Sequence, residues 1–358
     1  MGSLANAPLP RTLGRGFRAG VLLVVMLTLA ACEAPPPDPT VRVAGSTMGT
    51  SYDLKLVPAP GQVIPADFQT RADALLTRIN QALSTYDPNS ELSRFNRNAS
   101  TDWITVSPEL QQITAEALRI SALSDGVFDI TVGPLVNVWG FGPEPRRDQA
   151  PTDNEIAQAR SRVGYWRLQT REEPPALKKD RPDLYVDLSA IAKGYGVDQL
   201  AALAETAGIQ NYLMSIGGEI RARGLNGRGQ PWTIAIEKPV VGQRAVERLI
   251  RLGDRSVSTS GNYRNFFEYN GQRYSHIINP RTGQPVPQTL ASVTVISDQS
   301  MVADATATTL MAAGAEFGFQ LATAHHLAAF FILTGPEGRF EEHYTPEFEG
   351  YLVPPQPP

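Results

Sequence analysis

The sequence predicts an α+β fold, a single mixed domain that follows an export signal. Patterns typical of helices and of strands occur along the chain without strict alternation, which favours α+β over a doubly wound parallel sheet. No internal repeat, low-complexity segment or change in composition divides residues 41–352. Hydrophobic residues make up 42% of the 358-residue chain and charged residues 19%, as in globular proteins. We therefore expect one large domain over residues 41–352.

The N-terminal segment has the pattern of a secretory signal. Arg11, Arg15 and Arg18 precede an apolar run of 13 residues, "AGVLLVVMLTLAA", which is too short to span a bilayer. The run ends in small residues before Cys32, an ending similar to a bacterial lipobox; a plain signal peptide with a coincidental cysteine is the alternative. We expect a signal peptide at 1–31, a lipidated Cys32 with a Pro-rich tether at 32–40, and a Pro-rich tail at 353–358. The protein would then be lipid-anchored on the periplasmic side of a bacterial cell membrane.

Cysteine content and charge exclude several classes of protein. Cys32 is the one cysteine of the sequence, so with that thiol lipidated no disulfide, catalytic cysteine or cysteine zinc site is expected. The net charge of −4 and the lack of a Lys/Arg cluster with interleaved aromatic residues argue against a nucleic-acid partner. Phosphate-binding P-loop, G-x-S-x-G and G-x-G-x-x-G motifs are also missing from the sequence.

The first half of the domain reads as strands followed by helices. We expect a strand pair over 41–57 with a break at Gly45–Gly49, a helix over 66–84, a loop over 85–96 and a helix over 107–126. Ser107, Pro108 and Glu109 form a good helix start. Residues 128–142 have no clear period, and residues 152–164 indicate a short helix.

The second half contains most of the expected strands. "DLYVDLSAIAKGYGVDQLAALAETAG" (183–208) reads as strand, turn and helix, with Gly208 as the stop. Strands are expected over 211–224, 231–239, 248–267 with turns, 272–280, 291–298 and 327–333. A helix that begins near residue 300 follows the strand "ASVTVISD".

That last helix suggests a metal site. Asp304 and Thr308 are four residues apart, so the two side chains share one helical face. A solvated carboxylate beside a threonine bonded to its own helix is one reading. The other is a pair of oxygen ligands for Mg²⁺, which prefers one or two protein oxygens together with phosphate oxygens.

Three further motifs carry candidate chemistry. Asp187 lies at the end of an expected strand, and Lys193 near the following helix start, where a cation and free amides suit a phosphate; a Lys that extends to solvent is the alternative. His276 precedes an Asn-Pro turn, where side chains are often presented to a site, although a strand-end histidine bonded to backbone would look the same. "SIGGEI" and "STSGNY" add glycines and hydroxyls of the kind that contact phosphates or sugars.

Eight motifs in one order resemble a known family. They are "GSTMGTSY", "GVFDITVGPLVNVWGFG", "VDLSAIAKGYGVD", "YLMSIGGEIRARG", "PWTIAIEKP", "STSGNYRNF", "YSHIINPRTGQPV" and "SVTVISDQSMVADATATTL". Together they are similar to the ApbE family, the FAD:protein FMN transferases, over about Val41 to Leu333. The resemblance implies an ApbE-like fold, and a lipobox is usual for exported members of the family.

The resemblance also implies site residues. FAD contacts map onto Met48, Tyr86, Val127, Phe128, Asp129, Asp187, Lys193 and Ile278. The magnesium site of the family maps onto Asp304, Thr308 and the backbone carbonyl of Ala190. Asn279 stands where family members often have Asp, which puts a charge role there in doubt.

The function expected from these residues is transfer of FMN from FAD to a Ser or Thr hydroxyl of an acceptor protein, with release of AMP. Mg²⁺ and Lys193 would neutralise phosphoryl charge, and His276 is the candidate general base. The resemblance points to subunits of membrane electron-transfer complexes as acceptors. The alternatives are an FAD pyrophosphatase that uses water, and a non-catalytic FAD-binding lipoprotein. The acceptor, the choice of inner or outer membrane and the oligomeric state are not determined by the sequence.

Overall fold

A computed structural model describes residues 2, 38–144, 149–240, 242, 245–263, 265–335 and 338–354. Residues Pro39–Pro358 form one compact unit. The expected signal peptide, Cys32, most of the tether and the end of the tail lie outside the described residues. Within the part described, no helix combines the length and apolar character needed to cross a membrane.

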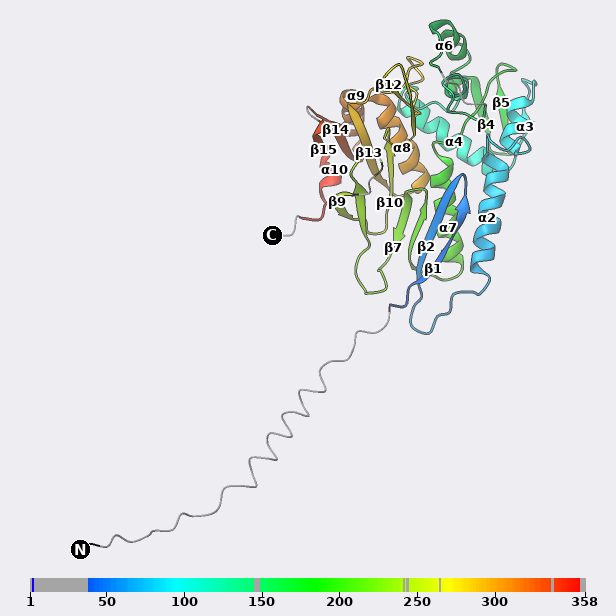
Figure 1. Cartoon of the computed structure of the whole chain (residues 1–358). Coiled ribbons are helices and arrows are strands. Elements are labelled where there is room, and N and C mark those ends of the chain that lie inside the picture. The colour runs from blue at the N-terminus through cyan, green and yellow to red at the C-terminus, as the bar shows by residue number, and fades with distance from the viewer. Residues whose placement is uncertain are drawn as a thin grey trace. The chain divides into compact units, whose positions relative to one another are not determined.

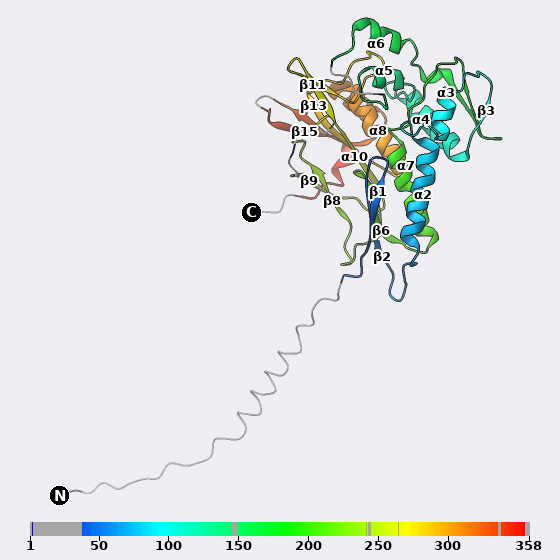
Figure 2. The same cartoon turned by 45° about the vertical axis from the view of Figure 1, so that its right-hand side comes forward.

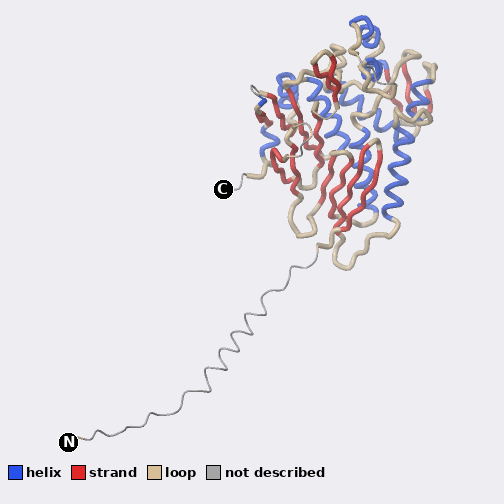
Figure 3. The backbone as a smooth tube through the Cα atoms, in the orientation of Figure 1, coloured by secondary structure: helices blue, strands red, loops and turns tan. Residues whose placement is uncertain are grey.

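An eight-stranded antiparallel sheet forms the centre of this unit (Figures 1 and 3). Its strands, in spatial order, are β1 (Val41–Thr47), β2 (Thr50–Val57), β6 (Asn211–Ile216), β7 (Glu219–Arg223), β10 (Ser256–Gly261), β13 (Leu290–Ser297), β14 (Ala328–Thr334) and β15 (Phe340–Tyr344). The smaller pairings are β3 (Ile104–Thr105), β5 (Ala176–Lys179) and β4 (Leu168–Arg171); β8 (Thr233–Glu237) and β9 (Val246–Arg251); and β11 (Phe266–Tyr269) and β12 (Gln272–Ser275).

The helices are α2 (Phe68–Leu83), α3 (Glu91–Arg97), α4 (Pro108–Leu123), α5 (Gly133–Val138), α6 (Asp153–Arg160), α7 (Ala192–Thr206), α8 (Ser300–Ala313), α9 (Ala315–Ala324) and α10 (Pro346–Glu349). A 3₁₀ turn occupies Tyr165–Arg167. The α+β class and the long elements agree with the sequence-based prediction.

The two faces of the sheet bury different layers because side chains alternate along each strand. Tyr212 and Met214 of β6 pack with α2 and α7 on one face, whereas Leu213 packs with the β8–β9 hairpin on the other. In β14, Phe331 packs with α8 and α9, and Phe330 packs with α10. Figure 2 shows α2, α7 and α8 together along one side of the sheet.

Three local predictions were wrong. Residues 211–224 were expected to be one strand, but they form β6 and β7 with a turn at Gly217 and Gly218 between them. Residues 85–96 were expected to be a loop, but α3 begins at Glu91 because the Ser90 hydroxyl accepts a hydrogen bond from the Ser93 amide at 2.9 Å and caps the helix. Residues 183–187 were expected to be a strand, but Asp183 lies in a turn and residues 184–187 belong to no strand. The side chain of Asn96 bonds the backbone amide and carbonyl of Val186, and the carbonyl of Ile130 accepts from the amide of Asp187.

Helices α7 and α8 cap each other. Neither N-cap residue, Ile191 or Gln299, makes a side-chain cap bond. Asp198 of α7 instead accepts from the amides of Ser300 and Met301 at 2.9 Å each, and Asp304 of α8 accepts from the amide of Gly194 at 3.0 Å. Carboxylates at helix N-termini compensate free amides and the helix dipole, so each helix fixes the start of the other.

A glycine makes this close approach possible. A Cβ atom on Gly194 would lie 2.3 Å from the carbonyl oxygen of Ser300 and 2.6 Å from the Cα of Met301. No side chain fits at that distance, so the first turn of α7 can rest directly on the first turn of α8.

Replacing Asp198 tests the mutual capping. Asp198→Ala removes two amide bonds and the 2.7 Å bond from Arg221, and we expect a loss of about 2–3 kcal/mol in the free energy of unfolding. Urea unfolding followed by circular dichroism measures it. Asp67→Ala is the matched control, because Asp67 is an N-cap residue that makes no side-chain cap bond. Equal midpoints for both variants would contradict the capping role.

Candidate active site

A cluster of three charged residues lies where α7, α8 and β7 meet. Lys193 of α7 hydrogen-bonds Glu219 at the start of β7, and its Nζ lies 3.4 and 3.5 Å from the two carboxylate oxygens of Asp304. Both carboxylates are buried and Lys193 is half-buried. With all three groups ionised, this ion cluster (Lys193, Glu219 and Asp304) carries a net negative charge that a divalent cation could balance.

Burial and the charge of the paired group shift the pKa values of Asp304 and Lys193 in opposite directions. Burial is the main cause that raises the pKa of Asp304; Lys193 opposes this effect and Glu219 adds to it. Burial alone would lower the pKa of Lys193, but Asp304 and Glu219 outweigh it and raise that pKa well above its ordinary value. Lys193 is therefore a permanent cation at neutral pH, and it favours the ionised form of the carboxylate beside it.

The other two predicted metal ligands lie on or next to the elements that carry this ion cluster. Thr308 follows Asp304 by one turn of α8, and its hydroxyl lies 3.0 Å from that of Ser260 in β10. Ala190 is in the turn that leads into α7, four residues before the Gly194 amide that binds Asp304. A carboxylate, a hydroxyl and a backbone carbonyl are hard oxygen donors that suit Mg²⁺.

This donor set has few carboxylates. In the described parts of the chain, no group of three or more His, Cys, Asp or Glu side chains is arranged to hold a metal ion. A cation bound here would therefore depend on Thr308, on a carbonyl and on ligand oxygens in addition to Asp304.

Met48 lies in a strained turn that packs against α7, the helix that carries Lys193. Met48 and Gly49 connect β1 to β2 with φ of 49° and 72°, values that are unusual for a residue with a side chain. The Met48 methyl group lies against Gly196 of α7, where an added Cβ would be 3.3 Å away. Strain of this kind is common at ligand sites, and here it holds the Met48 side chain against the helix that carries Lys193.

The two glycines of "SIGGEI" form the turn between β6 and β7. Gly217 and Gly218 have φ of 61° and 112°. A Cβ on Gly217 would lie 2.9 Å from the Thr50 methyl group and 3.5 Å from the Cδ of Lys193. This turn brings the start of β7, and with it Glu219, next to Lys193.

Tyr86 and Asp187 lie within electrostatic range of each other. Tyr86 is 64% exposed, and its hydroxyl donates to the carbonyl of Phe141 at 3.2 Å. Partial desolvation raises the pKa of Tyr86 and the charge of Asp187 raises it further. Burial, together with Asp187 and other neighbours, raises the pKa of Tyr185 to about 12. Two predicted FAD contacts, Tyr86 and Asp187, therefore belong to one region.

A cavity adjoins this region. Its volume is about 450 Å³, and its lining residues are Pro134, Asn137, Val138, Glu144, Arg162, Asp183 and Tyr185. The size suits part of a large ligand. Tyr185 connects the cavity to Asp187, two residues further along the chain.

The side chains of the predicted triplet Val127, Phe128 and Asp129 face the interior. All three residues are buried. One Asp129 oxygen accepts from the amide and hydroxyl of Thr131 at 2.7 and 2.6 Å, and the other accepts from the amide of Tyr165 at 2.8 Å. A ligand contact from this triplet would therefore use backbone atoms.

One ring nitrogen of His276 is hydrogen-bonded to the backbone. Its Nδ1 lies 3.0 Å from the carbonyl of Asn265, which can only accept, so Nδ1 carries the hydrogen and Nε2 of the neutral ring is a proton acceptor. Desolvation lowers the pKa of His276, and the charge of Lys193 lowers it further. His276 is thus within electrostatic range of the ion cluster and neutral near pH 7.

Ile278 and Asn279 shape the loop that carries His276. Ile278 is buried and packs with Leu135 and Trp139. The Asn279 amide donates to the carbonyl of Ala312 at 3.0 Å and its Oδ1 accepts from the amide of Arg281 at 2.9 Å. A side-chain amide can both donate to Ala312 and accept from Arg281, so the turn forms without a carboxylate at position 279.

The roles of two residues in this region, Glu219 and Asp198, were not predicted from the sequence. Glu219 was read as an ordinary strand residue, although its position directly after a Gly-Gly pair was a signal that the chain turns there. Asp198 is inside a helix pattern, and nothing in the sequence indicates that it caps another helix.

Comparisons with known proteins give one consistent match. The ApbE family model matches residues 48–331. The chain is 46% identical to an FAD:protein FMN transferase of Vibrio cholerae, over 93% of this chain and 98% of that protein. It is 42% identical to an FAD:protein FMN transferase of Haemophilus influenzae, over 89% of this chain and 94% of that protein.

Solved structures agree. The flavin transferase ApbE from Vibrio cholerae superposes with a TM-score of 0.81 at 45% identity, covering 88% of this chain and 100% of that one. The ApbE protein from Thermotoga maritima gives a TM-score of 0.78 at 25% identity, covering 87% of this chain and 98% of that one.

Proposed function

We propose that this chain, a member of the ApbE family and an FAD:protein FMN transferase, uses Mg²⁺ and modifies a Ser or Thr hydroxyl of its acceptor protein. The acceptor oxygen forms a bond to the phosphorus of the FMN half of FAD, the diphosphate bridge breaks, and AMP leaves. The observation that carries the proposal is the ion cluster beside Thr308, which gathers a permanent cation and oxygen donors at one corner of the fold.

The side chains of the ion cluster and its neighbours would bind either the metal ion or the diphosphate of FAD. Asp304, Thr308 and the carbonyl of Ala190 would hold Mg²⁺, which supplies charge neutralisation for a diphosphate. Lys193 would add a further positive charge for the same phosphates. Glu219 fixes the Lys193 ammonium so that it cannot swing away.

FAD would extend from this corner towards Asp187. Met48 offers an apolar contact, and Tyr86 with Asp187 offers an exposed ring and a carboxylate near the cavity; a contact from the buried Ile278 would use its backbone. His276 accepts the proton of the acceptor hydroxyl at Nε2, because Nδ1 is held by Asn265.

Two other activities use the same binding residues. A pyrophosphatase would pass the FMN group to water, and a storage lipoprotein would keep FAD intact. Incubation with FAD, Mg²⁺ and a flavin-accepting subunit of a membrane electron-transfer complex separates the three, with in-gel flavin fluorescence and AMP measured together. Transfer gives fluorescent protein and AMP, hydrolysis gives free FMN and AMP, and storage gives neither.

The anchor proposal rests on Cys32 and the small residues before it. Stable membrane attachment needs more than one acyl chain, which bacterial lipoproteins carry. We expect Cys32→Ser to leave the protein in the soluble fraction while the purified protein keeps its transferase activity. Retention of Cys32→Ser in the membrane pellet, measured by fractionation, would rule the anchor out.

Removing the metal ligands should abolish transfer. We expect Asp304→Ala to lower the turnover rate by about 10²–10³. Thr308→Ala should lower it less, since one neutral oxygen is lost, and a chelator should reproduce the loss in the wild type. Single-turnover AMP release at several Mg²⁺ concentrations measures the effect. Near wild-type turnover of Asp304→Ala at low Mg²⁺ would refute the assignment.

His276 should matter for chemistry and not for affinity. We expect His276→Ala to bind FAD normally and to lose about 10²–10⁴ in transfer rate. Because desolvation depresses the pKa of His276 below its ordinary value of 6.5, the base stays unprotonated at neutral pH, and the wild-type rate should fall only as pH drops through that lower pKa. Fluorescence titration and a pH–rate profile test both. An equal loss of affinity and rate would make His276 a binding residue.

A further inference from the structure

The segment 184–188, which carries Asp187 and Tyr185, is fixed by side chains from outside the main sheet. Leu184, Val186 and Leu188 are buried, yet no strand pairs with this segment. Its buried backbone groups therefore need partners from elsewhere.

Asn96, at the end of α3, supplies them. Its Nδ2 donates to the carbonyl of Val186 at 2.8 Å, and its Oδ1 accepts from the amide of Val186 at 2.8 Å. One side chain thus makes the two bonds that a neighbouring strand residue would make. The next residue, Asp187, donates its amide to the carbonyl of Ile130 at 2.7 Å.

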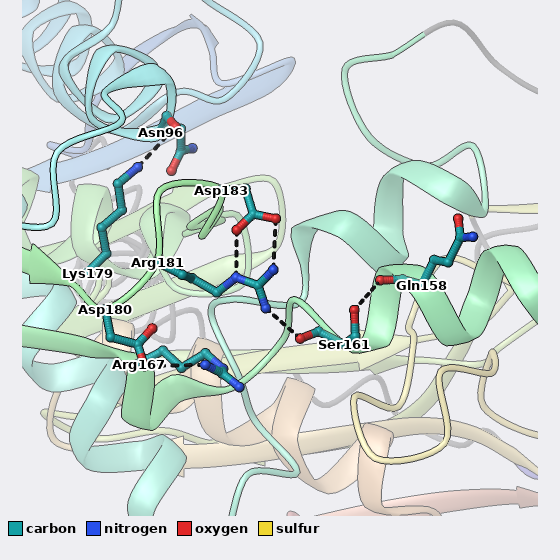
Figure 4. A network of polar contacts seen from close by, with 8 residues as sticks. All are labelled: Asn96, Gln158, Ser161, Arg167, Lys179, Asp180, Arg181 and Asp183. Carbon is teal, nitrogen blue, oxygen red and sulfur yellow. Dashed lines mark hydrogen bonds and ion pairs between the residues drawn. The ribbon is translucent and has the colours of Figure 1, made fainter.

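Lys179 holds Asn96 in turn (Figure 4). It is fully buried, and its Nζ lies 3.3 Å from the carbonyls of both Phe95 and Asn96, in the last turn of α3. Cations near the C-terminal end of a helix are favourable, so the ammonium fixes the helix end that presents the Asn96 side chain. The active site described above makes no use of this buried lysine.

Hydrogen bonds of Arg181 also fix the chain just before the segment. Arg181 binds the carboxylate of Asp183 with two bonds, at 2.6 and 2.9 Å, and donates to the carbonyl of Ser161 at 2.8 Å (Figure 4). At the other end, the Asp187 carboxylate accepts from the amide of Ser189, the residue that follows the segment, at 2.9 Å. Asn96 acts on the stretch between these two fixed points.

We propose that Asn96, supported by Lys179, is a positioning residue for FAD that acts through Val186 to place the neighbouring Asp187 carboxylate. This inference rests on the proposed function, because it takes Asp187 as a contact for FAD. A misplaced segment would move Asp187 away from Tyr86 and Tyr185 away from the cavity, so affinity for FAD falls while Asp304, Lys193 and His276 keep their places.

The test is a double-mutant cycle on FAD affinity, measured by flavin fluorescence without any acceptor. Asn96→Leu keeps the volume of the side chain and removes both bonds, and we expect the Kd for FAD to rise about tenfold. In an Asp187→Ala background the same change should raise Kd by a clearly smaller factor, because the group it positions is already gone. Near-ultraviolet circular dichroism checks that each variant is folded.

Asn98→Asp is the matched control. Asn98 is two residues further along, is exposed, and its side chain accepts from the amide of Ser100 at 2.9 Å without touching segment 184–188. We expect its Kd for FAD to equal that of the wild type. Lys179→Met provides a second variant, which should raise Kd in the same direction and decide the matter if Asn96→Leu fails to fold.

Two results would overturn the inference. One is an unchanged Kd in folded Asn96→Leu, or in Lys179→Met if only that variant folds; the other is an equal rise of Kd in both backgrounds. Failure of the proposed function is separate: it would appear in the wild type itself, as FAD binding without transfer or as no FAD binding.

Discussion

The bond between the Asp304 carboxylate and the Gly194 amide is the interaction on which the site depends. It caps α7 from α8, while Asp198 caps α8 from α7, and Gly194 leaves room for the two first turns to touch. The start of α7 carries Lys193 and follows Ala190, and α8 carries Thr308. Mutual capping therefore brings together groups that are more than 100 residues apart in the sequence.

The same interaction explains why an aspartate is useful there. A carboxylate has about four lone-pair sites, so Asp304 can cap α7, face Lys193 and still offer an oxygen to a cation. Burial makes an ionised carboxylate costly unless it is paired, and Lys193 provides that pairing. The capping role and the proposed metal-ligand role are thus joined in one side chain, and Glu219 hydrogen-bonds the lysine beside it.

The sequence predicted the parts that local rules determine. Helical spacing placed Asp304 and Thr308 on one face of α8, and capping residues located the start of α4. It missed α3, because the Asp, Pro and Asn content of residues 85–96 outweighed the Ser90 cap. It also called residues 183–187 a strand, since an apolar extended pattern does not reveal whether the hydrogen-bonding partner is a strand or the side chain of Asn96. The sequence did not indicate the roles of Glu219 and Asp198, because the groups that these two residues bind are distant in the sequence.

The central claim is that Ala190, in the turn before α7, and Asp304 and Thr308 of α8 hold one metal ion. Crystals soaked with Mn²⁺ and FAD, with diffraction data collected at the manganese edge, test it directly. The account predicts an anomalous difference peak that contacts an Asp304 oxygen, the Thr308 hydroxyl and the carbonyl of Ala190, and no such peak in Asp304→Ala crystals. A peak elsewhere in the protein, or one that persists at this corner without Asp304, would contradict it.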